Sequence, residues 1–193
     1  MNVNDKVSME YETRVMIDEK DYQLISAKAL NSGGICRVFT NKNIYFDTED
    51  LYLTNHHMVL RIREIISNES HEKELTLKIK GEDGDKEITR NLNLDEEYIL
   101  DEEINKELSN RGADVSKLEK ITTLTTERIE VPYSDHLLVI DKNYYNEKID
   151  FNLEVESTSR EIAKKYLLDF IKEYDIEYKE DYISKSRRAI LHL

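Results

Sequence analysis

Hydrophobic and polar residues alternate along much of the chain with the period of two that is typical of β-strands. The runs are rich in β-branched and aromatic residues and are separated by polar or glycine-containing segments. They predict eight strands, at about residues 9–17, 36–47, 58–66, 73–80, 86–94, 120–133, 137–145 and 149–157. The Asp83-Gly84 pair favours a hairpin turn between the fourth and fifth strands.

Three other segments carry apolar residues at the spacing of an amphipathic helix. Polar capping residues and glycines set their expected limits. These limits are Asp18 to Gly33-Gly34 for the first helix, Asp95 to Gly112 for the second, and the capping-box pair Thr158 and Glu161 at the start of the third. Residues 182–193 fit neither a strand nor a helix clearly.

These elements predict a single α+β domain over residues 1–193, because no segment resembles an interdomain linker and Pro132 is the only proline. An open sheet of eight strands would leave two exposed edges, whereas closure removes them. We therefore expect a closed, eight-stranded antiparallel β-barrel with helices packed outside.

The polar faces of four predicted strands carry sorted charges. Residues two apart on a strand share a face, so the following sets are each expected to lie together. They are Glu10, Glu12 and Arg14; Arg61 and Arg63; Thr76, Lys78 and Lys80; and Asn152, Glu154 and Glu156. An ordinary sheet would turn such faces to water. The sorting by sign instead favours a barrel with a charged interior whose apolar outer faces are covered by helices.

Composition limits the partners of such an interior. The formal net charge of -13 argues against nucleic acid and anionic membranes as partners, since both are polyanions. Residues 1–6 lack the apolar core of a signal peptide, and no stretch is long enough to span a membrane, so we expect a cytoplasmic protein. Cys36 is the only cysteine, which excludes an intrachain disulfide and a zinc site built from several thiolates.

Arginine and lysine in rows are suited to a chain of phosphates, because arginine grips phosphate oxygens through two hydrogen bonds and lysine adds a mobile charge. Carboxylates brought together either take up protons or hold a hard cation, and Mg²⁺ or Mn²⁺ accepts oxygen ligands. The expected ligand is therefore a small polyphosphate with a divalent metal ion.

The segment Glu10-Tyr11-Glu12-Thr13-Arg14 resembles the Glu-x-Glu-x-Lys signature of the CYTH superfamily, the triphosphate tunnel metalloenzymes. Further segments resemble later strands of that family: Tyr45-Phe46-Asp47-Thr48, Leu60-Arg61-Ile62-Arg63, Thr76-Leu77-Lys78-Ile79-Lys80, Thr126-Glu127-Arg128 and Val139-Ile140-Asp141. The layout is most similar to an uncharacterised branch from low-GC Gram-positive bacteria. The resemblance implies an eight-stranded tunnel that binds triphosphate-bearing small molecules with Mg²⁺ or Mn²⁺.

The resemblance also implies roles for residues at matching positions. The expected triphosphate-binding residues are Arg61, Arg63, Lys78, Lys80, Arg128 and Lys185, with Arg90 added although it shares a face with Ile88 and Leu92. The expected metal ligands are Glu10, Glu12, Asp141, Glu154 and Glu156, and the expected catalytic residues are Glu10, Glu12 and Arg14. Arg14 replaces the family's usual lysine, and since arginine does not deprotonate, it suits phosphate binding better than proton transfer.

Three functions are consistent with these residues. The first is metal-dependent hydrolysis of inorganic triphosphate or of a small organic triphosphate such as thiamine triphosphate. The second is the adenylyl cyclase activity of class IV enzymes, which would also need a nucleobase pocket. The third is a non-catalytic module that binds polyphosphate or a nucleotide.

Overall fold

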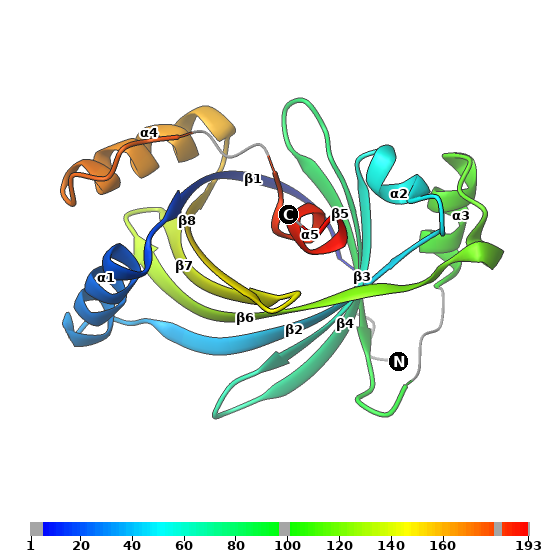
Figure 1. Cartoon of the computed structure of the whole chain (residues 1–193), viewed down its shortest axis with the longest axis horizontal. Helices are drawn as coiled ribbons and strands as arrows, with labels where there is room; N and C mark the ends of the chain where they lie inside the picture. Colours follow the sequence, from blue (N-terminus) through cyan, green and yellow to red (C-terminus); the bar gives the residue numbers. More distant parts are fainter. Residues whose placement is uncertain (1–5, 97–100, 180–182, 193) are drawn as a thin grey trace.

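The computed structural model describes residues 6–96, 101–179 and 183–192 (Figure 1). Its strands are β1 (Lys6–Ile17), β2 (Arg37–Asp47), β3 (Met58–Ile66), β4 (His71–Ile79), β5 (Asp85–Leu92), β6 (Glu119–Tyr133), β7 (His136–Tyr145) and β8 (Lys148–Ser157). Its helices are α1 (Glu19–Asn31), α2 (Tyr52–Asn55), α3 (Glu102–Asn110), the 3₁₀ turn η1 (Val115–Lys117), α4 (Arg160–Lys172) and α5 (Lys185–Ile190). None of the helices in these described ranges is long and apolar enough to cross a membrane.

The eight strands close into a barrel in the order β1-β5-β4-β3-β2-β6-β7-β8, and every neighbouring pair is antiparallel. The predicted closed barrel and its strand count are confirmed. β8 pairs with β1 and lies four places from β3 around the ring, so the acidic strand predicted near the end of the chain stands opposite the first basic strand.

The barrel is apolar outside and polar inside. One outer cluster packs Leu60, Leu77 and Ile88 of the β3–β5 side against Ile104 and Leu108 of α3. Each of these side chains is at most 1% exposed, and burying one contributes roughly 1.5–3 kcal/mol. The helices that cover this face therefore hold the polar faces of the strands toward the interior.

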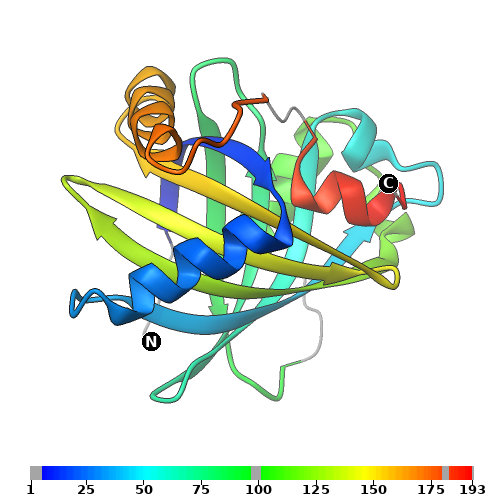
Figure 2. The ribbon, with the colours of Figure 1, turned by 60° about the vertical axis from the view of Figure 1, so that its left-hand side comes forward.

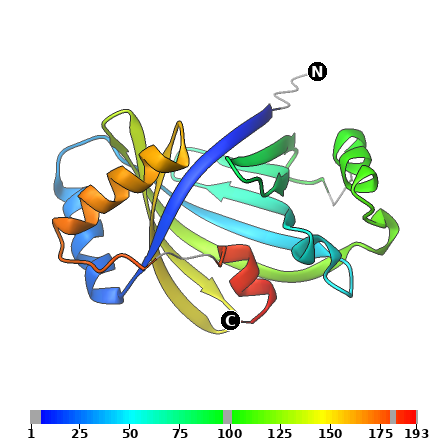
Figure 3. The same cartoon turned by 90° about the horizontal axis from the view of Figure 1, so that it is seen from above.

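A second outer cluster lies on the opposite side of the barrel. Val15 and Leu153, from β1 and β8, pack against Ile25 of α1 and against Ala163 and Leu167 of α4. Figure 3 shows α1 and α4 together on one side of the barrel and α3 on the other. The expected helices on the outside are thus confirmed, in two groups.

The helix limits agree with the sequence at some ends and not at others. Asp18 caps α1 as expected, through a hydrogen bond from Asp21 N to its Oδ1 at 2.8 Å. Asp95 was wrongly predicted as a helix start: it lies in a turn, and α3 is capped by Asp101, whose carboxylate accepts from the first free backbone N–H groups. Likewise Ser159, not Thr158, caps α4.

The tail of the chain forms α5, which lies within the ring of strands in Figure 1 and near one end of the barrel in Figure 2. Its residues Ala189 and Ile190 pack on Tyr45, Leu124 and Tyr145. This contact explains why a short segment without clear periodicity is helical: six residues form too little helix to be stable alone, and packing against the barrel supplies the rest.

Candidate functional site

The barrel encloses a cavity of about 490 Å³. Most of the residues predicted from the sequence to form a site line this cavity. They are Glu10, Glu12, Arg14, Arg61, Arg63, Lys78, Lys80, Arg128, Glu154, Glu156 and Lys185.

On β3, Arg61 and Arg63 alternate with the outward-facing Leu60 and Ile62. Arg63 donates from Nε to Asn43 Oδ1 at 3.0 Å, and its Nη1 lies 3.4 Å from Glu74 Oε1. Burial, followed by the charges of Arg61 and Arg128, lowers the pKa of Arg63. The charged form of Arg63 is thus disfavoured mainly by burial, and a bound anion would stabilise it.

Lys78 of β4 has carboxylates on several sides. Its Nζ lies 2.9 Å from Glu10 Oε2, 3.4 Å from Asp85 Oδ2, 3.6 Å from Glu12 Oε1 and 3.8 Å from Glu87 Oε1. Burial lowers the pKa of Lys78, but the charges of these neighbours, Glu12 and Glu10 foremost, outweigh burial and raise it. Lys78 is therefore surrounded by carboxylates from β1 and β5.

Three carboxylates gather where β1 meets β8. One oxygen from each of Glu12, Glu154 and Glu156 lies within 4.8 Å of the others. Glu12 and Glu156 are directly paired in the β1–β8 register, which brings these side chains together. Burial and the charges of Glu12 and Glu154 raise the pKa of Glu156 to about 7, although Arg128 lowers it. Such a crowded set of hard oxygen donors fits a divalent cation such as Mg²⁺ or Mn²⁺.

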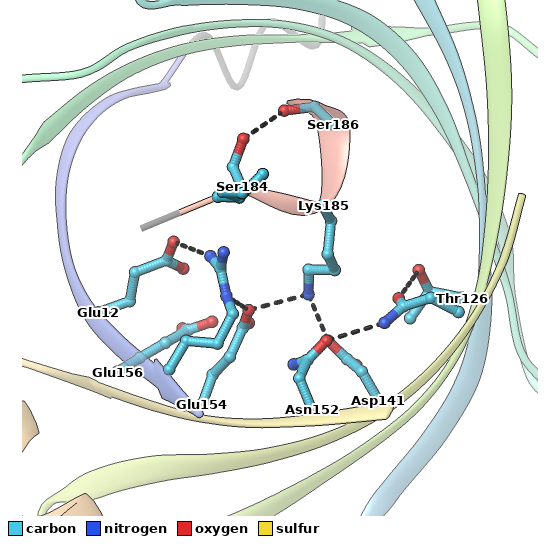
Figure 4. Close-up of polar contacts among 12 residues, drawn as sticks. Glu12, Thr126, Asp141, Asn152, Glu154, Glu156, Ser184, Lys185 and Ser186 are labelled. Atoms are coloured by element: carbon cyan, nitrogen blue, oxygen red, sulfur yellow. Dashed lines mark hydrogen bonds and ion pairs between the residues drawn. The ribbon is translucent and has the colours of Figure 1, made fainter. Parts of the chain in front are cut away.

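Arg14 lies between two of these carboxylates. It donates from Nε to Glu154 Oε1 at 2.5 Å and from Nη2 to Glu12 Oε1 at 2.8 Å. Figure 4 shows Glu12, Glu154 and Glu156 side by side on the cavity wall. In this arrangement Arg14 orients carboxylates.

Asp141 of β7 is fully buried and does not line the cavity. Its carboxylate accepts two hydrogen bonds from Arg128, Nε to Oδ1 and Nη2 to Oδ2, both at 2.9 Å. It also pairs with Lys185, whose Nζ lies 3.0 Å from Glu154 Oε1 (Figure 4). Burial would raise the pKa of Asp141, but Arg128 and Lys185 lower it. Asp141 thus holds two cations in place, and its role as a metal ligand stays a prediction.

Two other predicted residues lie apart from the carboxylate cluster. Glu10 lines the cavity but pairs with Lys78, outside the group of three carboxylates.

Arg90 does not line the cavity: it shares the outward face of Ile88 and contacts α3, with Nε 3.2 Å from Asp101 Oδ2 and Nη2 bonded to Glu103. The bulge that would have turned Arg90 inward does not occur, since β5 keeps its register with β4 through this residue.

The cavity also contains polar residues that the sequence pattern did not single out. They include Asn41 and Asn43 of β2, Asp85 and Glu87 of β5, Thr126 of β6 and Arg160 of α4. The residues on β2 and β5 alternate with outward-facing residues, so the period of two could have predicted that they face the interior. Arg160 comes from a helix packed outside the barrel, and strand alternation carries no information about it.

A family model described as CYTH domain matches residues 8–189 of the chain. A search of curated proteins found no match. Among solved structures, a Bacillus halodurans protein described as a candidate adenylate cyclase superposes with a TM-score of 0.78 and 26% identity, over 92% of this chain and 96% of that one.

Two further structures share the fold at lower identity. A candidate adenylyl cyclase from Hippeastrum, with a dominant triphosphatase activity, has a TM-score of 0.66 and 21% identity over 93% of this chain and 94% of that one. A Pyrococcus horikoshii protein has a TM-score of 0.68 and 16% identity over 95% and 99%. Because the family model spans residues 8–189, nearly all of the sequence, the chain belongs to the CYTH domain family.

Proposed function

We propose that this protein binds a triphosphate in its tunnel together with Mg²⁺ or Mn²⁺ and hydrolyses a phosphoanhydride bond of inorganic triphosphate or of a small organic triphosphate. The observation that carries the proposal is the meeting of two charged groups in one cavity. Arg61, Arg63 and Arg128 line the same space as the carboxylate cluster of Glu12, Glu154 and Glu156.

The arginines are suited to phosphate oxygens because their donors are planar and permanently charged. Arg61 is the most available of them: its buried Nε has no hydrogen-bond partner within the described parts of the chain, and Nη2 makes only a 3.5 Å ion pair with Glu87. Lys185 and Arg128 are held by Asp141 and Glu154, so they are oriented before a ligand arrives. Such pre-organisation stabilises charge that develops on a transferred phosphoryl group.

Glu12, Glu154 and Glu156 are the residues that would hold the metal ion, and metal dependence is a property of the CYTH family. A bound divalent ion would neutralise negative charge on the phosphoryl oxygens. Arg14 and Lys185 keep Glu154 ionised, because their charges, with that of Arg128, outweigh burial and hold its pKa well below the usual range. Glu156 must lose its proton before it can act as a ligand near neutral pH.

A second candidate function is an adenylyl cyclase that converts ATP to cyclic AMP and pyrophosphate. The 26% identity to the Bacillus halodurans candidate adenylate cyclase favours including it. The ion pairs of Arg14 with Glu12 and Glu154 motivate a third candidate, a binding module without turnover, since they engage two of the three clustered carboxylates.

One assay separates the three candidates. Inorganic triphosphate, thiamine triphosphate, ATP and pyrophosphate are each incubated with Mg²⁺ or Mn²⁺, and phosphate, pyrophosphate and cyclic AMP are quantified. We expect phosphate release from a triphosphate. Cyclic AMP from ATP would replace hydrolysis by cyclisation, and metal-dependent binding without any product would leave only the binding module.

Three variants link the activity to the tunnel. Arg63→Met and Glu156→Gln should each lower phosphate release by at least about tenfold, the effect expected for one lost charged contact. Lys42→Met is the matched control, because Lys42 is exposed and lies on the same strand as the inward-facing Asn41 and Asn43. Equal activity in all three variants would exclude the tunnel as the active site.

A further inference from the structure

The inner wall of β2 contains an asparagine whose carbonyl oxygen lacks a partner. Asn41 is 2% exposed and lines the cavity, and its Oδ1 has no hydrogen-bond partner in the described residues. Asn43, the next inward-facing residue, differs: its Oδ1 accepts from Arg63 and its Nδ2 donates to Leu124 O at 3.3 Å. A buried amide group without a partner is costly, and native proteins rarely keep one without a reason.

Strand register places Asn41 between two phosphate-binding candidates. Its neighbour Asn43 pairs with Arg63 across β2 and β3, and Asn41 pairs with Thr126 across β2 and β6. Arg128 is the next inward residue after Thr126. Asn41 itself pairs with Ile65 on β3, so it is a neutral side chain diagonal to Arg63 on one side and to Arg128 on the other.

From these observations we propose that Asn41 is a substrate-binding residue, whose amide Nδ2 donates a hydrogen bond to a phosphoryl oxygen of the bound triphosphate. The inference rests on the proposed function, since it requires an anion in the tunnel. Half a turn of the amide exchanges its oxygen and nitrogen at almost no change in shape. A phosphoryl oxygen at this position accepts from the nitrogen end, which gives this side of the amide a partner.

A neutral donor at this place also has a chemical use. Burial lowers the pKa of Arg63, and the charges of Arg61 and Arg128 lower it further. An amide adds a hydrogen bond to the phosphate chain without adding a fourth charge. The site then binds phosphate oxygens without a further cost of repulsion in the unliganded protein.

The test measures binding and stability together, with tripolyphosphate as the probe and EDTA present so that no turnover occurs. In Asn41→Leu, of nearly equal size, we expect tripolyphosphate to bind about tenfold more weakly, the effect of one hydrogen bond to a charged group. The same variant without ligand should melt about 2–4 °C higher, because a buried carbonyl oxygen without a partner has been removed. Asn41→Asp should bind at least as weakly as Asn41→Leu, since a carboxylate cannot donate and repels phosphate.

Thr40→Val is the control, because Thr40 neighbours Asn41 on the strand and faces the other way. It should leave binding unchanged. Equal binding by the wild type and Asn41→Leu would overturn this inference alone, as would undiminished binding by Asn41→Asp, which would assign Asn41 an acceptor role. A lower melting temperature of unliganded Asn41→Leu would also overturn it. If the wild type itself binds no tripolyphosphate, with or without Mg²⁺, the proposed function fails first.

Discussion

Arg188 of α5 grips Asp150 of β8 through two hydrogen bonds, Nε to Oδ2 at 2.9 Å and Nη2 to Oδ1 at 3.3 Å. Arg188 is also close in sequence to Lys185, the residue of α5 that contacts Asp141 and Glu154 in the tunnel. The Arg188–Asp150 pair therefore fixes α5, the short helix from which Lys185 enters the candidate site.

A chain of side-chain amides continues from this pair into the site. Asn143 donates to Asp150 Oδ1 and to Asn152 Oδ1, both at 2.8 Å, and Asn152 donates to Asp141 Oδ2 at 3.4 Å. Thr126 adds a hydrogen bond to Asn143 at 2.8 Å. Figure 4 shows Thr126, Asn152 and Asp141 near one another, with Lys185 bonded to Asp141. These hydrogen bonds connect the Arg188–Asp150 pair to Asp141 through one polar network.

The first prediction concerns this anchor. Asp150→Asn should weaken tripolyphosphate binding about threefold to tenfold, because α5 is held less firmly and Lys185 is less well placed. A double-mutant cycle measures whether the effect passes through Lys185: in a Lys185→Met background, Asp150→Asn should have little further effect on the dissociation constant.

The control for the anchor is Lys179→Met, which removes an ion pair with Glu177 in which both side chains are more than three-quarters exposed. It should change binding by less than a factor of two. Additive effects of Asp150→Asn and Lys185→Met would contradict a positioning role and indicate that Asp150 acts elsewhere.

The second prediction separates the outside of the barrel from the inside. Arg90→Met should lower the free energy of unfolding by about 1–3 kcal/mol, since Asp101 and Glu103 at the start of α3 lose their buried partner. Tripolyphosphate affinity should stay unchanged. Arg63→Met should do the reverse, weakening binding with a small effect on stability, because burial, and after it the charges of Arg61 and Arg128, already disfavour the charged form of Arg63.

Urea unfolding and calorimetric titration of both variants check this contrast. If Arg90→Met binds tripolyphosphate more weakly and keeps the stability of the wild type, the prediction is wrong and Arg90 binds phosphate.

The barrel and most of its inner wall could be predicted because a period of two encodes both strand and face. Glu154 and Glu156, for example, alternate with the outward Leu153 and Val155, and the structure keeps that alternation. The same rule applied strictly would have put Arg90 outside with Ile88. The family resemblance, not the pattern, suggested that it faces inward.

Other features depend on contacts that a strand pattern does not contain. Lys185 reaches the tunnel only because α5 packs on Tyr45 and Leu124, two residues far away in sequence. Asp141 could be placed near the site, but its partnership with Arg128 and Lys185 follows from three-dimensional geometry. The sequence alone therefore could not show which cations Asp141 contacts.

The third prediction concerns Arg160, which clamps the β4–β5 hairpin to α4. Its Nη1 donates to Gly81 O at 3.0 Å and to Glu82 O at 2.6 Å, and its Nη2 donates to Asp85 Oδ1 at 2.6 Å. Arg160→Met should speed amide hydrogen exchange in the hairpin and lower stability by about 1 kcal/mol, a value reduced by the partial exposure of the arginine.

The matched control for Arg160 is Arg111→Met, which removes an ion pair to Glu107 within the α3 region. That change should cost less than about 0.5 kcal/mol and should leave exchange in the hairpin as it is. Unaltered hairpin exchange in Arg160→Met would show that the β4–β5 turn is held by other contacts.

The last prediction is a pH dependence of stability set by Glu156. Its pKa is about 7 in the folded protein against 4.5 for an ordinary glutamate, so between these values the folded state binds a proton that the unfolded chain has released. The free energy of unfolding of the metal-free protein should therefore fall as pH rises from about 5 to about 7 and then level off.

Asp141 and Glu154 do not produce this slope, because their pKa values are lowered. Their contributions to the free energy of unfolding are complete above the pH range in which unfolded carboxyl groups titrate. Urea unfolding in EDTA across this range checks it: Glu156→Gln should flatten the curve, whereas an equal slope in the variant would assign the proton to another group.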